Sequence, residues 1–452
     1  MSNELDLSLQ NLSLNKSEFY SNIPDLKEKM LYEKNWIKSS DRDKIIMNPR
    51  EIEEYNKKSI EIVLPILDLE KYSKYLSKEE LIIKINSISS PPKFERFHED
   101  GKLVSVEYYN KLIENCNIDG LTDSNNVKYG ITIRKTVMRT FPTFDKVFKV
   151  GDNYEFDRFQ ETSVYPVEPI VILHTSKDHK WYFAQMYNYL AWIPEKDVAL
   201  SPKEELFNYI NTEHFIVTTG KRVFTNYNPL NPQLSEVKFD MGIRIPLVNI
   251  KEIEDDVYGQ NPTGNYVIKI PIKNISGDVE FRPALISRRE EVSKGYLPYT
   301  RENIIVHAFK FLGERYGWGG TFNSRDCASL IMDVYRTMGI KLTRNSDQQG
   351  ELSVGNFYKM PENMTIGDRE RLLYKLKPGT PLYMEGHAMI YLGTEHGKYY
   401  IIHDFSGFYK EQKEKTEYYK VREVMVSPLN IGLTEEGKTF VEGLYGGKDF
   451  VL

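Results

Sequence analysis

Residues 316–340 read YGWGGTFNSRDCASLIMDVYRTMGI, a turn rich in Gly and Trp that runs into a cysteine opening an apolar helical stretch. A thiol at a helix N-terminus lies at the positive end of the peptide dipoles, which favours the thiolate. Because the thiolate is the nucleophilic form, Cys327 is the first candidate for chemistry. A lone cysteine in an apolar helix is more often a buried core residue, and Asp326 before it is a typical helix cap. The cysteine therefore needs partners elsewhere in the chain.

Two histidines are candidate partners for this cysteine. His387 opens the predicted strand HAMIYLG, and His403 ends the predicted strand YYIIHDF. The connection between them, residues 394–397, is typical of a hairpin turn. If Gly393 pairs with Gly397, the two histidines lie directly opposite each other, with Cβ atoms about 4.5–5.5 Å apart. A cysteine hydrolase needs a thiolate, an imidazole and a group that orients the imidazole, and these three side chains supply that set.

Length, charge and cysteine content exclude several classes of protein. A chain of 452 residues predicts about two to four domains. A net charge of −5 without a long basic run argues against nucleic acid as a partner. The two cysteines, Cys116 and Cys327, form neither a disulfide framework nor a zinc set, and we expect no metal and no cofactor.

The N-terminal sequence, MSNELDLSLQNLSLNKSEFY, lacks the basic start and apolar core of a secretory signal. No stretch of roughly 18 apolar residues occurs, so we expect no transmembrane segment. The expected location is cytoplasmic, with the periplasm or cell envelope as the alternative if a leader has been removed.

Changes in sequence pattern divide the chain into four expected units. Helical patterns come first, with a helix start at Pro49 and a capping box between Ser77 and Glu80. Two stretches of short strands with closely spaced turns suggest two small β-barrels. Helices followed by antiparallel strands then indicate an α+β domain. The expected units are a mostly helical N-terminal region (1–125), two barrels (126–205 and 206–296) and the α+β domain (297–452).

Residues 303–410 resemble the NlpC-type cell-wall cysteine peptidases, which have a papain-like fold. The motifs YGWGG, DC at a helix start, GIKLTRNSDQQ, GHAMIYLG and IIHDFSG occur in the order of that family. Upstream, MNPREIEEYNKK resembles the N-terminal stabilising segment of such enzymes. VMRTFPT, FDRFQET and EPIVILHTSKDHKWYFA resemble the first of two bacterial SH3-like domains, and GKRVFTNY resembles the second. The resemblance covers most of the chain after residue 20.

The resemblance implies a role for each candidate site residue. It implies Cys327 as the nucleophile, His387 as the general base and His403 as the orienting third member. The remaining implied roles are oxyanion stabilisation by Tyr316, binding of the free amine of an N-terminal L-Ala by Asp326, and contact with the D-glutamyl carboxylate by Ser346.

The resemblance also implies hydrolysis of the γ-D-glutamyl–L-diamino acid bond in peptidoglycan stem peptides, with the first barrel limiting the site to short peptides that carry a free N-terminal L-Ala. Ala328 stands where the family usually has Ser, which leaves the substrate preference open. Diaminopimelate and lysine are both open as the third stem residue. A non-catalytic peptidoglycan-binding protein, and an amidase or acyltransferase on the same scaffold, are the alternatives.

Overall fold

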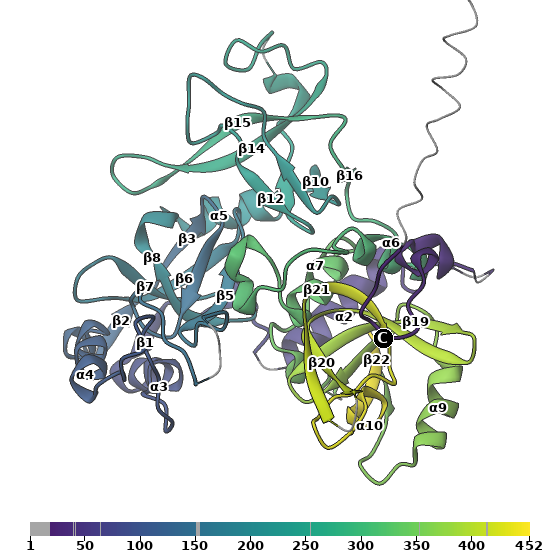
Figure 1. Ribbon diagram of the computed structural model, residues 1–452. Coiled ribbons are helices and arrows are strands. Elements are labelled where there is room, and N and C mark those ends of the chain that lie inside the picture. The colour runs from purple at the N-terminus through teal and green to yellow at the C-terminus, as the bar shows by residue number, and fades with distance from the viewer. Residues whose placement is uncertain are drawn as a thin grey trace, which may run out of the picture.

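The structure, a computed structural model, describes residues 19–38, 40, 42–63, 65–150, 154–253, 255–351, 353–412 and 415–452. Figure 1 shows three β-rich lobes, with the helices of the N-terminal region lying beside the first and the last of them. The first 18 residues of the expected N-terminal region lie outside the described part. Within the described part, no helix has the length and apolar character that crossing a membrane requires.

Both helix starts predicted for the N-terminal region are confirmed. α2 (Pro49–Ile62) begins after Asn48, whose side chain caps its first turn. α3 (Lys78–Ile88) begins after Ser77, whose Oγ accepts a hydrogen bond from the backbone N–H of Glu80 at 3.1 Å, while the Glu80 carboxylate accepts from the N–H of Ser77 at 2.7 Å. The other elements are η1 (Glu28–Leu31), η2 (Glu33–Asn35), η3 (Leu69–Lys71), β1 (Tyr75–Ser77), α4 (Val106–Asn115), η4 (Ile118–Gly120) and β2 (Ser124–Asn126).

The first β-rich lobe is one antiparallel sheet in the order β5-β4-β8-β7-β6-β3-β9. The loop after α3 is bonded to it, because Ser89 accepts a hydrogen bond from the indole of the buried Trp192 at 2.8 Å and donates one to the carbonyl of Thr140 at 2.7 Å. The strands are β3 (Lys128–Thr132), β4 (Thr136–Arg139), β5 (Gln160–Val164), β6 (Pro169–Thr175), β7 (Trp181–Gln185), β8 (Leu190–Pro194) and β9 (Val198–Ser201), with η5 (Glu195–Asp197) before the last.

The second β-rich lobe is made of three small sheets. Their orders are β13-β10-β16, β11-β12 and β14-β15, so the described residues form no single continuous sheet here. A second SH3-like barrel therefore stays a prediction. The elements are α5 (Lys203–Ile210), β10 (Phe215–Thr218), β11 (Arg222–Phe224), β12 (Lys238–Asp240), β13 (Arg244–Pro246), η6 (Ile250–Glu252), β14 (Asn265–Lys273), β15 (Val279–Ser287) and β16 (Val292–Lys294).

The C-terminal lobe has the predicted α+β composition, a six-stranded antiparallel sheet in the order β17-β22-β18-β19-β20-β21 with helices on both faces. One core joins α6 and α7 to one face of the sheet, and a second core joins α9 and α10 to the other. The elements are α6 (Arg301–Phe309), η7 (Trp318–Asn323), α7 (Cys327–Arg336), α8 (Ser346–Gln349), β17 (Asn356–Lys359), α9 (Ile366–Lys375), β18 (Pro381–Met384), β19 (His387–Glu395), β20 (Lys398–Gln412), β21 (Lys415–Pro428), α10 (Phe440–Gly443) and β22 (Leu444–Asp449).

The predicted register of β19 and β20 is wrong by two residues. Both strands run further than expected, to a two-residue turn at His396-Gly397 whose residues have φ of 51° and 74°. Ile390 pairs with Ile402, so His403 lies in register with Met389 rather than with His387. A shift of two residues keeps every side chain on its face, so the two histidines stay on the same face as diagonal neighbours.

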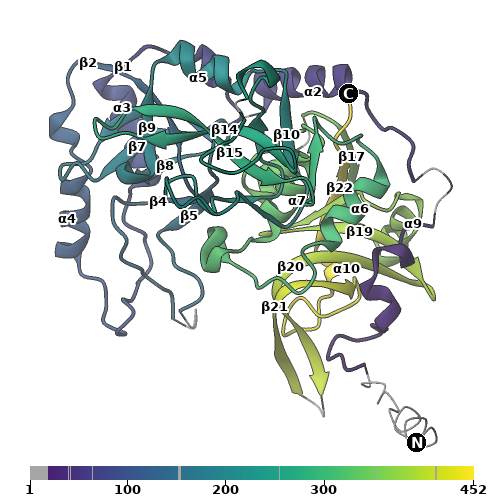
Figure 2. The ribbon, with the colours of Figure 1, turned by 90° about the horizontal axis from the view of Figure 1, so that it is seen from above.

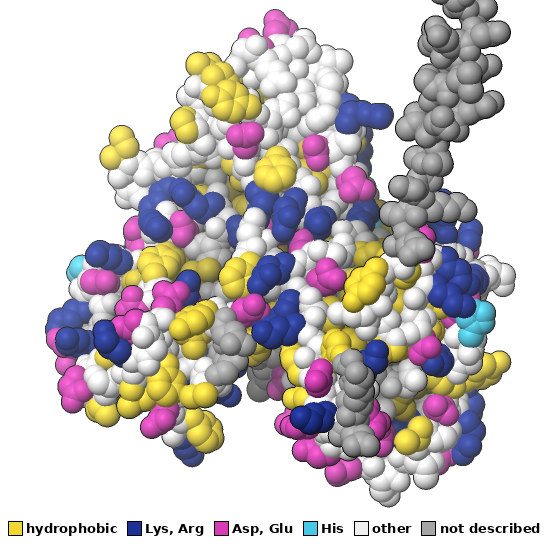
Figure 3. All heavy atoms as spheres, viewed as in Figure 1, with side chains coloured by type: hydrophobic (Ala, Val, Ile, Leu, Met, Phe, Trp, Pro, Cys, Tyr) yellow, Lys and Arg dark blue, Asp and Glu magenta, His cyan; other side chains and the backbone are white. Residues whose placement is uncertain are grey.

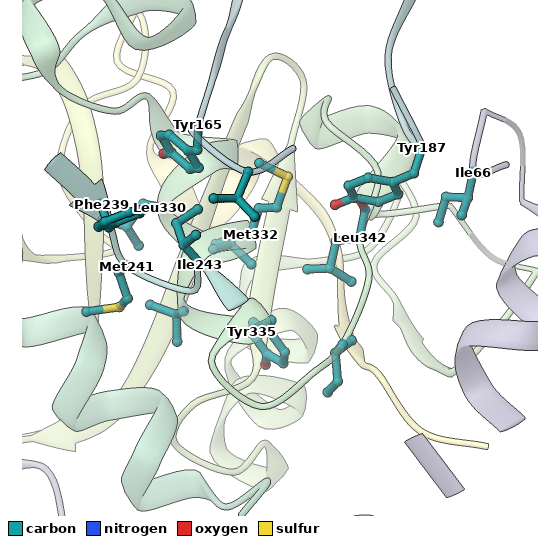
Figure 4. Packing of buried hydrophobic residues seen from close by; sticks show 14 of the residues in the cluster. Ile66, Tyr165, Tyr187, Phe239, Met241, Ile243, Leu330, Met332, Tyr335 and Leu342 are labelled. Atoms are coloured by element: carbon teal, nitrogen blue, oxygen red, sulfur yellow. The ribbon is translucent and has the colours of Figure 1, made fainter. Parts of the chain in front are cut away.

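The three lobes pack against one another around α7. Figure 4 shows Tyr165 of the first lobe, Phe239 and Met241 of the second, and Leu330 and Met332 of α7 in one cluster. Figure 2 shows the same junction from above, with β5 beside the turn that leads into α7. On the face seen in Figure 3, Lys and Arg side chains gather where the lobes meet, with Asp and Glu among them. The nucleophile candidate is therefore the first residue of a helix that all three lobes enclose.

Candidate active site

Cys327 is the first residue of α7 and is almost buried, with 8% of its surface exposed. Asp326 is the N-cap, and its carboxylate accepts a hydrogen bond from the backbone N–H of Ser329 at 3.0 Å. In the preceding turn η7, Gly319 and Gly320 adopt left-handed conformations with φ of 57° and 82°. The N–H of Gly319 donates to the Asp326 carboxylate at 3.1 Å, which ties the glycine turn to the helix start.

Cys327 and His387 are both neutral in the ligand-free site. Burial, followed by the negative charge of Asp326, raises the pKa of the Cys327 thiol to about 12, while a hydrogen bond from the backbone N–H of Ala388 acts in the opposite direction. Burial lowers the pKa of His387 to about 4. Burial and Asp326 therefore act against the thiolate that the helix N-terminus favours. The contact with Ala388 places the thiol beside the residue that follows His387.

The two histidines form a hydrogen-bonded chain with Ser427 of β21. His387 Nε2 lies 2.8 Å from His403 Nδ1, and His403 Nε2 lies 2.9 Å from Ser427 Oγ. The His403 ring also stacks on Phe405, with ring centroids 3.8 Å apart. Burial, and then the neighbouring His387, holds the pKa of His403 well below its usual range. If each Nε2 carries the proton along this chain, Nδ1 of His387 remains as the proton acceptor.

Tyr316 lies beside the thiol as a protonated phenol. Burial, and next the charge that Cys327 would carry, raises the pKa of Tyr316 well above its usual value. The backbone N–H of Tyr316 donates to the carbonyl of Arg422 at 2.9 Å, which attaches the start of the glycine turn to β21. The hydroxyl is thus available as a hydrogen-bond donor near the reacting sulfur.

The predicted role of Asp326 as the amine-binding group does not fit the structure. Arg344 makes a two-pronged ion pair with the Asp326 carboxylate, at 2.6 Å and 3.2 Å. The arginine and then its hydrogen bonds offset the effect of burial and hold the pKa of Asp326 below its usual value. With three further hydrogen bonds from Gly319 and Ser329, the carboxylate is saturated and its charge is compensated. Asp326 is a positioning residue for the helix start.

Arg344 was missed at the level of the sequence. It lies within the motif GIKLTRNSDQQ, where an arginine next to a polar loop has no distinguishing signal. Its side chain is buried, and its Nε also donates to Thr162 of β5 at 2.6 Å. Ser346, the first residue of α8, is half-buried, and within the described residues its hydroxyl makes no hydrogen bond, which leaves it available to a ligand.

The first lobe forms one wall of the site, and Glu161 is a second residue that the sequence did not reveal. Gln160 Nε2 donates to the carbonyl of Gly319 at 2.8 Å, so β5 holds the glycine turn directly. The next residue, Glu161, accepts hydrogen bonds from Tyr189 and from Thr140. Within the described residues Glu161 has no cationic partner. Burial, and then the charge of Glu161, raises the pKa of Tyr189, while Arg344 lowers it and Asp326 raises it further. Because Arg344 and Asp326 both act on the phenol that bonds to Glu161, this carboxylate lies close to the helix start.

Among the described residues, no group of three or more His, Cys, Asp or Glu side chains is placed to hold a metal ion. The polar groups of the site are instead those of a cysteine hydrolase, with a thiol, an imidazole chain and a phenol donor around one helix start.

Comparison with known families agrees with this reading of the site. Residues 313–427 match the NlpC/P60 family, and residues 142–194 match an SH3 domain of the SH3b1 type. The chain carries an NlpC/P60 domain. The NlpC/P60 match implies a cysteine peptidase or hydrolase, and proteins of that family are typically cell-wall hydrolases. The SH3b1 and NlpC/P60 domains together indicate peptidoglycan-related binding.

Among solved structures, the chain is similar to an NlpC/P60 endopeptidase from Photobacterium damselae subsp. piscicida, with a TM-score of 0.73 and 18% identity over 92% of this chain and 95% of that one. An NlpC/P60 family protein from Bacillus cereus ATCC 10987 matches with a TM-score of 0.47 and 16% identity over 72% of this chain and all of that one. At these identities the likeness to the first structure shows a shared fold. No curated protein matches the chain in sequence.

Proposed function

We propose that this protein is a cysteine peptidase that hydrolyses the γ-D-glutamyl–L-diamino acid bond of peptidoglycan stem peptides and prefers short peptides with a free N-terminal L-Ala. The observation that carries the proposal is the hydrogen-bonded chain from His387 through His403 to Ser427. This chain begins beside the Cys327 thiol, because the thiol accepts a hydrogen bond from the backbone N–H of Ala388, the residue after His387. Such a chain orients a base for proton transfer, which favours catalysis over binding of the cell wall alone.

The reaction begins from the neutral pair. As the Cys327 sulfur attacks the amide carbon, its proton passes to Nδ1 of His387, and His403 Nδ1 stabilises the imidazolium by accepting the hydrogen bond from His387 Nε2. The Tyr316 hydroxyl and the backbone N–H of Cys327 stabilise the oxyanion. His387 then gives its proton to the leaving amine, which leaves a thioester on Cys327. Water, deprotonated by His387, attacks the thioester and releases the γ-D-glutamyl product with the free thiol.

The free N-terminus of the substrate would bind at Glu161. This carboxylate lies beside the helix start and has no cation among the described residues, whereas Asp326 is already neutralised by Arg344. An ammonium group supplies the missing charge, and the Tyr189 hydroxyl fixes the carboxylate that receives it. The wall formed by β5 and Glu161 then explains a preference for short peptides, because a longer chain would have to pass through it.

The first experiment compares the full chain with Cys327→Ala on L-Ala-γ-D-Glu-diaminopimelate and L-Ala-γ-D-Glu-L-Lys, with mass spectrometry of the released dipeptide. We expect release by the unaltered protein and none by Cys327→Ala, because no thioester can form. Hydroxylamine added to the reaction would trap a hydroxamate from the same thioester, and the ratio of hydrolysis to transfer separates a peptidase from an acyltransferase. A protein that binds either peptide without cleaving it would support the non-catalytic alternative instead.

The second experiment tests the amine site with Glu161→Gln, and with Glu204→Gln on the exposed face of α5 as the matched control. We expect Glu161→Gln to raise KM for the free tripeptide by about tenfold or more, since a hydrogen bond to a charged group contributes roughly 1.5–3 kcal/mol. N-acetylation of the substrate should have the same effect on the unaltered protein and no further effect on the variant. Equal KM values for free and acetylated substrate would contradict the amine site while leaving the peptidase proposal intact.

A further inference from the structure

A cavity of about 590 Å³ lies at the opposite end of α7 from Cys327. Its walls come from α2 with the loop that follows it, the β5–β6 loop, the β7–β8 turn, the second lobe, the linker at Tyr296, and residues 336–341 at the end of the nucleophile helix. A ten-residue helix is about 15 Å long, so this cavity is separate from the site at the N-terminus of α7. Its volume falls within the range of about 300–1,000 Å³ that is typical of small-molecule sites.

Two cations that line the cavity have no carboxylate partner among the described residues. The Arg244 guanidinium donates to the backbone carbonyls of Ile210 and Thr212 and lies 3.9 Å from the ring centroid of Phe215. Lys341 lies over the Tyr187 ring, 6.0 Å from its centroid. Arg244 is half-buried and Lys341 is exposed, and partial desolvation by the surrounding protein lowers the pKa of both cations.

Most other charges around the cavity are already paired. Arg336 bonds to Glu168 at 2.7 Å. Glu53 and Asp68 pair with Lys57 and Lys71 of their own segments, at 2.9 Å and 3.0 Å. Glu70 is the one lining carboxylate without a cation in the described part of the chain, and it accepts a hydrogen bond from Asn211 at 3.3 Å. Arg244 and Lys341 therefore make no ion pair within the described residues, although the charges of Glu168 and Asp68 also act on Lys341. An added anion would give these two cations a direct partner.

Aromatic rings form much of the remaining wall. Tyr187, Phe207, Phe215 and Tyr296 all line the cavity. Tyr296 lies in the linker between the second and third lobes and is 45% exposed. Its ring contacts the Phe215 ring edge-on, with the ring centroids 5.0 Å apart. Tyr187 and Phe207 are buried, which leaves the exposed ring of Tyr296 and the half-buried ring of Phe215 beside Arg244. These two rings next to a cation suit a ligand that has an anionic group at one end and an apolar face at the other.

We propose that this junction cavity binds a small molecule bearing a carboxylate or phosphate, with the anion at Arg244 and Lys341 and the body of the molecule against Phe215 and Tyr296. The geometry favours a ligand of the size of a sugar acid or a dipeptide. Because all three lobes and α2 contribute to the walls, such a ligand would also hold the lobes together. This inference does not depend on the proposed peptidase activity.

The test is isothermal titration calorimetry of the full chain at low salt with three probes: inorganic phosphate, the carboxylate-bearing amino sugar N-acetylmuramic acid, and N-acetylglucosamine, which lacks the carboxylate. We expect saturable one-site binding of at least one anionic probe and none of N-acetylglucosamine. Binding of phosphate alone identifies a phosphate ligand, and binding of N-acetylmuramic acid alone identifies a carboxylate on a larger body.

Three variants locate the binding. Lys341→Glu should weaken the binding of the anionic probes at least about tenfold, because a negative charge that repels the anion replaces the cation. Tyr296→Leu should weaken the sugar acid more than phosphate. Lys251→Gln, on the exposed surface of the second lobe, and Cys327→Ala, at the other site, should leave the affinity unchanged. No saturable binding of either anion, or equal affinity in Lys341→Glu that has a normal melting temperature, would overturn the proposal.

Discussion

Asp404 follows His403 on β20, is fully buried, and has no hydrogen-bond partner for either carboxylate oxygen. Burial, and then the negative charges of Asp326 and Glu314, raises the pKa of Asp404 well above its usual range. Burial therefore favours the neutral acid form of Asp404 in the folded protein. The unfolded chain ionises at this residue near neutral pH, so this group costs stability as the pH rises above the unfolded pKa of 3.8.

Asp404→Asn should therefore stabilise the protein at pH 7, because the amide needs no proton to stay neutral. The gain should shrink toward pH 4, where the unfolded aspartate is itself half protonated. Urea unfolding at pH 4 and pH 7 measures both values, and Asp119→Asn on the surface is the control. If Asp404→Asn is less stable than the unaltered protein at pH 7, the raised pKa of Asp404 is not what limits stability there.

Arg344 pairs with Asp326, the N-cap of α7, and so lets this buried carboxylate stay ionised. Removing one partner of a buried ion pair leaves an uncompensated charge and costs about 3–5 kcal/mol. Arg344→Met should therefore lower the melting temperature and also reduce kcat, since Asp326 would turn toward water and disturb the first turn of α7. Arg371→Met, which breaks an exposed pair with Asp368, is the control and should change the melting temperature little. Circular dichroism gives the melting temperatures of the unaltered protein and of Arg344→Met. Equal melting temperatures would argue that the Arg344–Asp326 pair does not position the helix start.

At the scale of elements, the turn η7 is where the first lobe meets the nucleophile helix. A Cβ on Gly320 would lie 2.2 Å from the Ser163 hydroxyl of β5, and the residue has a φ of 82°. Gly320→Ala should therefore both strain the backbone and push β5 away from the site. Gly101 has a similar φ of 79° with no atom within 4 Å, so Gly101→Ala incurs the backbone cost of about 1 kcal/mol alone.

We expect Gly320→Ala to lower kcat/KM by about tenfold or more, because small displacements at a catalytic turn are costly. Gly101→Ala should lower only the melting temperature, by a few degrees. Kinetics and melting of the two variants, taken together, separate strain from displacement. Equal losses of activity in both would show that β5 does not position the turn.

Local elements could be predicted from the sequence, and long-range pairing could not. The helix starts at Asn48 and Ser77 depend on residues within one turn, so their caps are visible in the sequence. The register of β19 and β20 was missed because a shift of two residues preserves the alternation of apolar side chains. Arg344 was missed because its partner, Asp326, is 18 residues away and only folding brings them together.

At the scale of the molecule, a buried ionic network joins the lobes immediately before the nucleophile. Arg325, which has no exposed surface, bonds to Asp240 of β12 at 3.1 Å, to Asp333 of α7 at 2.7 Å and to Glu314 at 2.6 Å. Tyr165 of the first lobe donates a hydrogen bond to Asp333 at 2.6 Å. The segment that holds Cys327 is therefore held by groups from all three lobes.

The C-terminal domain should therefore not fold alone, although its sheet and helices are contiguous in sequence. A chain of residues 297–452 would expose the face of α7 that carries Leu330 and Met332, which Figure 4 shows packed against the other lobes, and would remove Asp240 from Arg325. Buried charges that lose a partner and apolar faces that lose their cover both favour aggregation. We expect this fragment to be insoluble on its own and soluble when residues 1–296 are co-expressed with it. Cooperative melting of the isolated fragment near the melting temperature of the full chain would show that the first 296 residues serve recognition rather than assembly of the site.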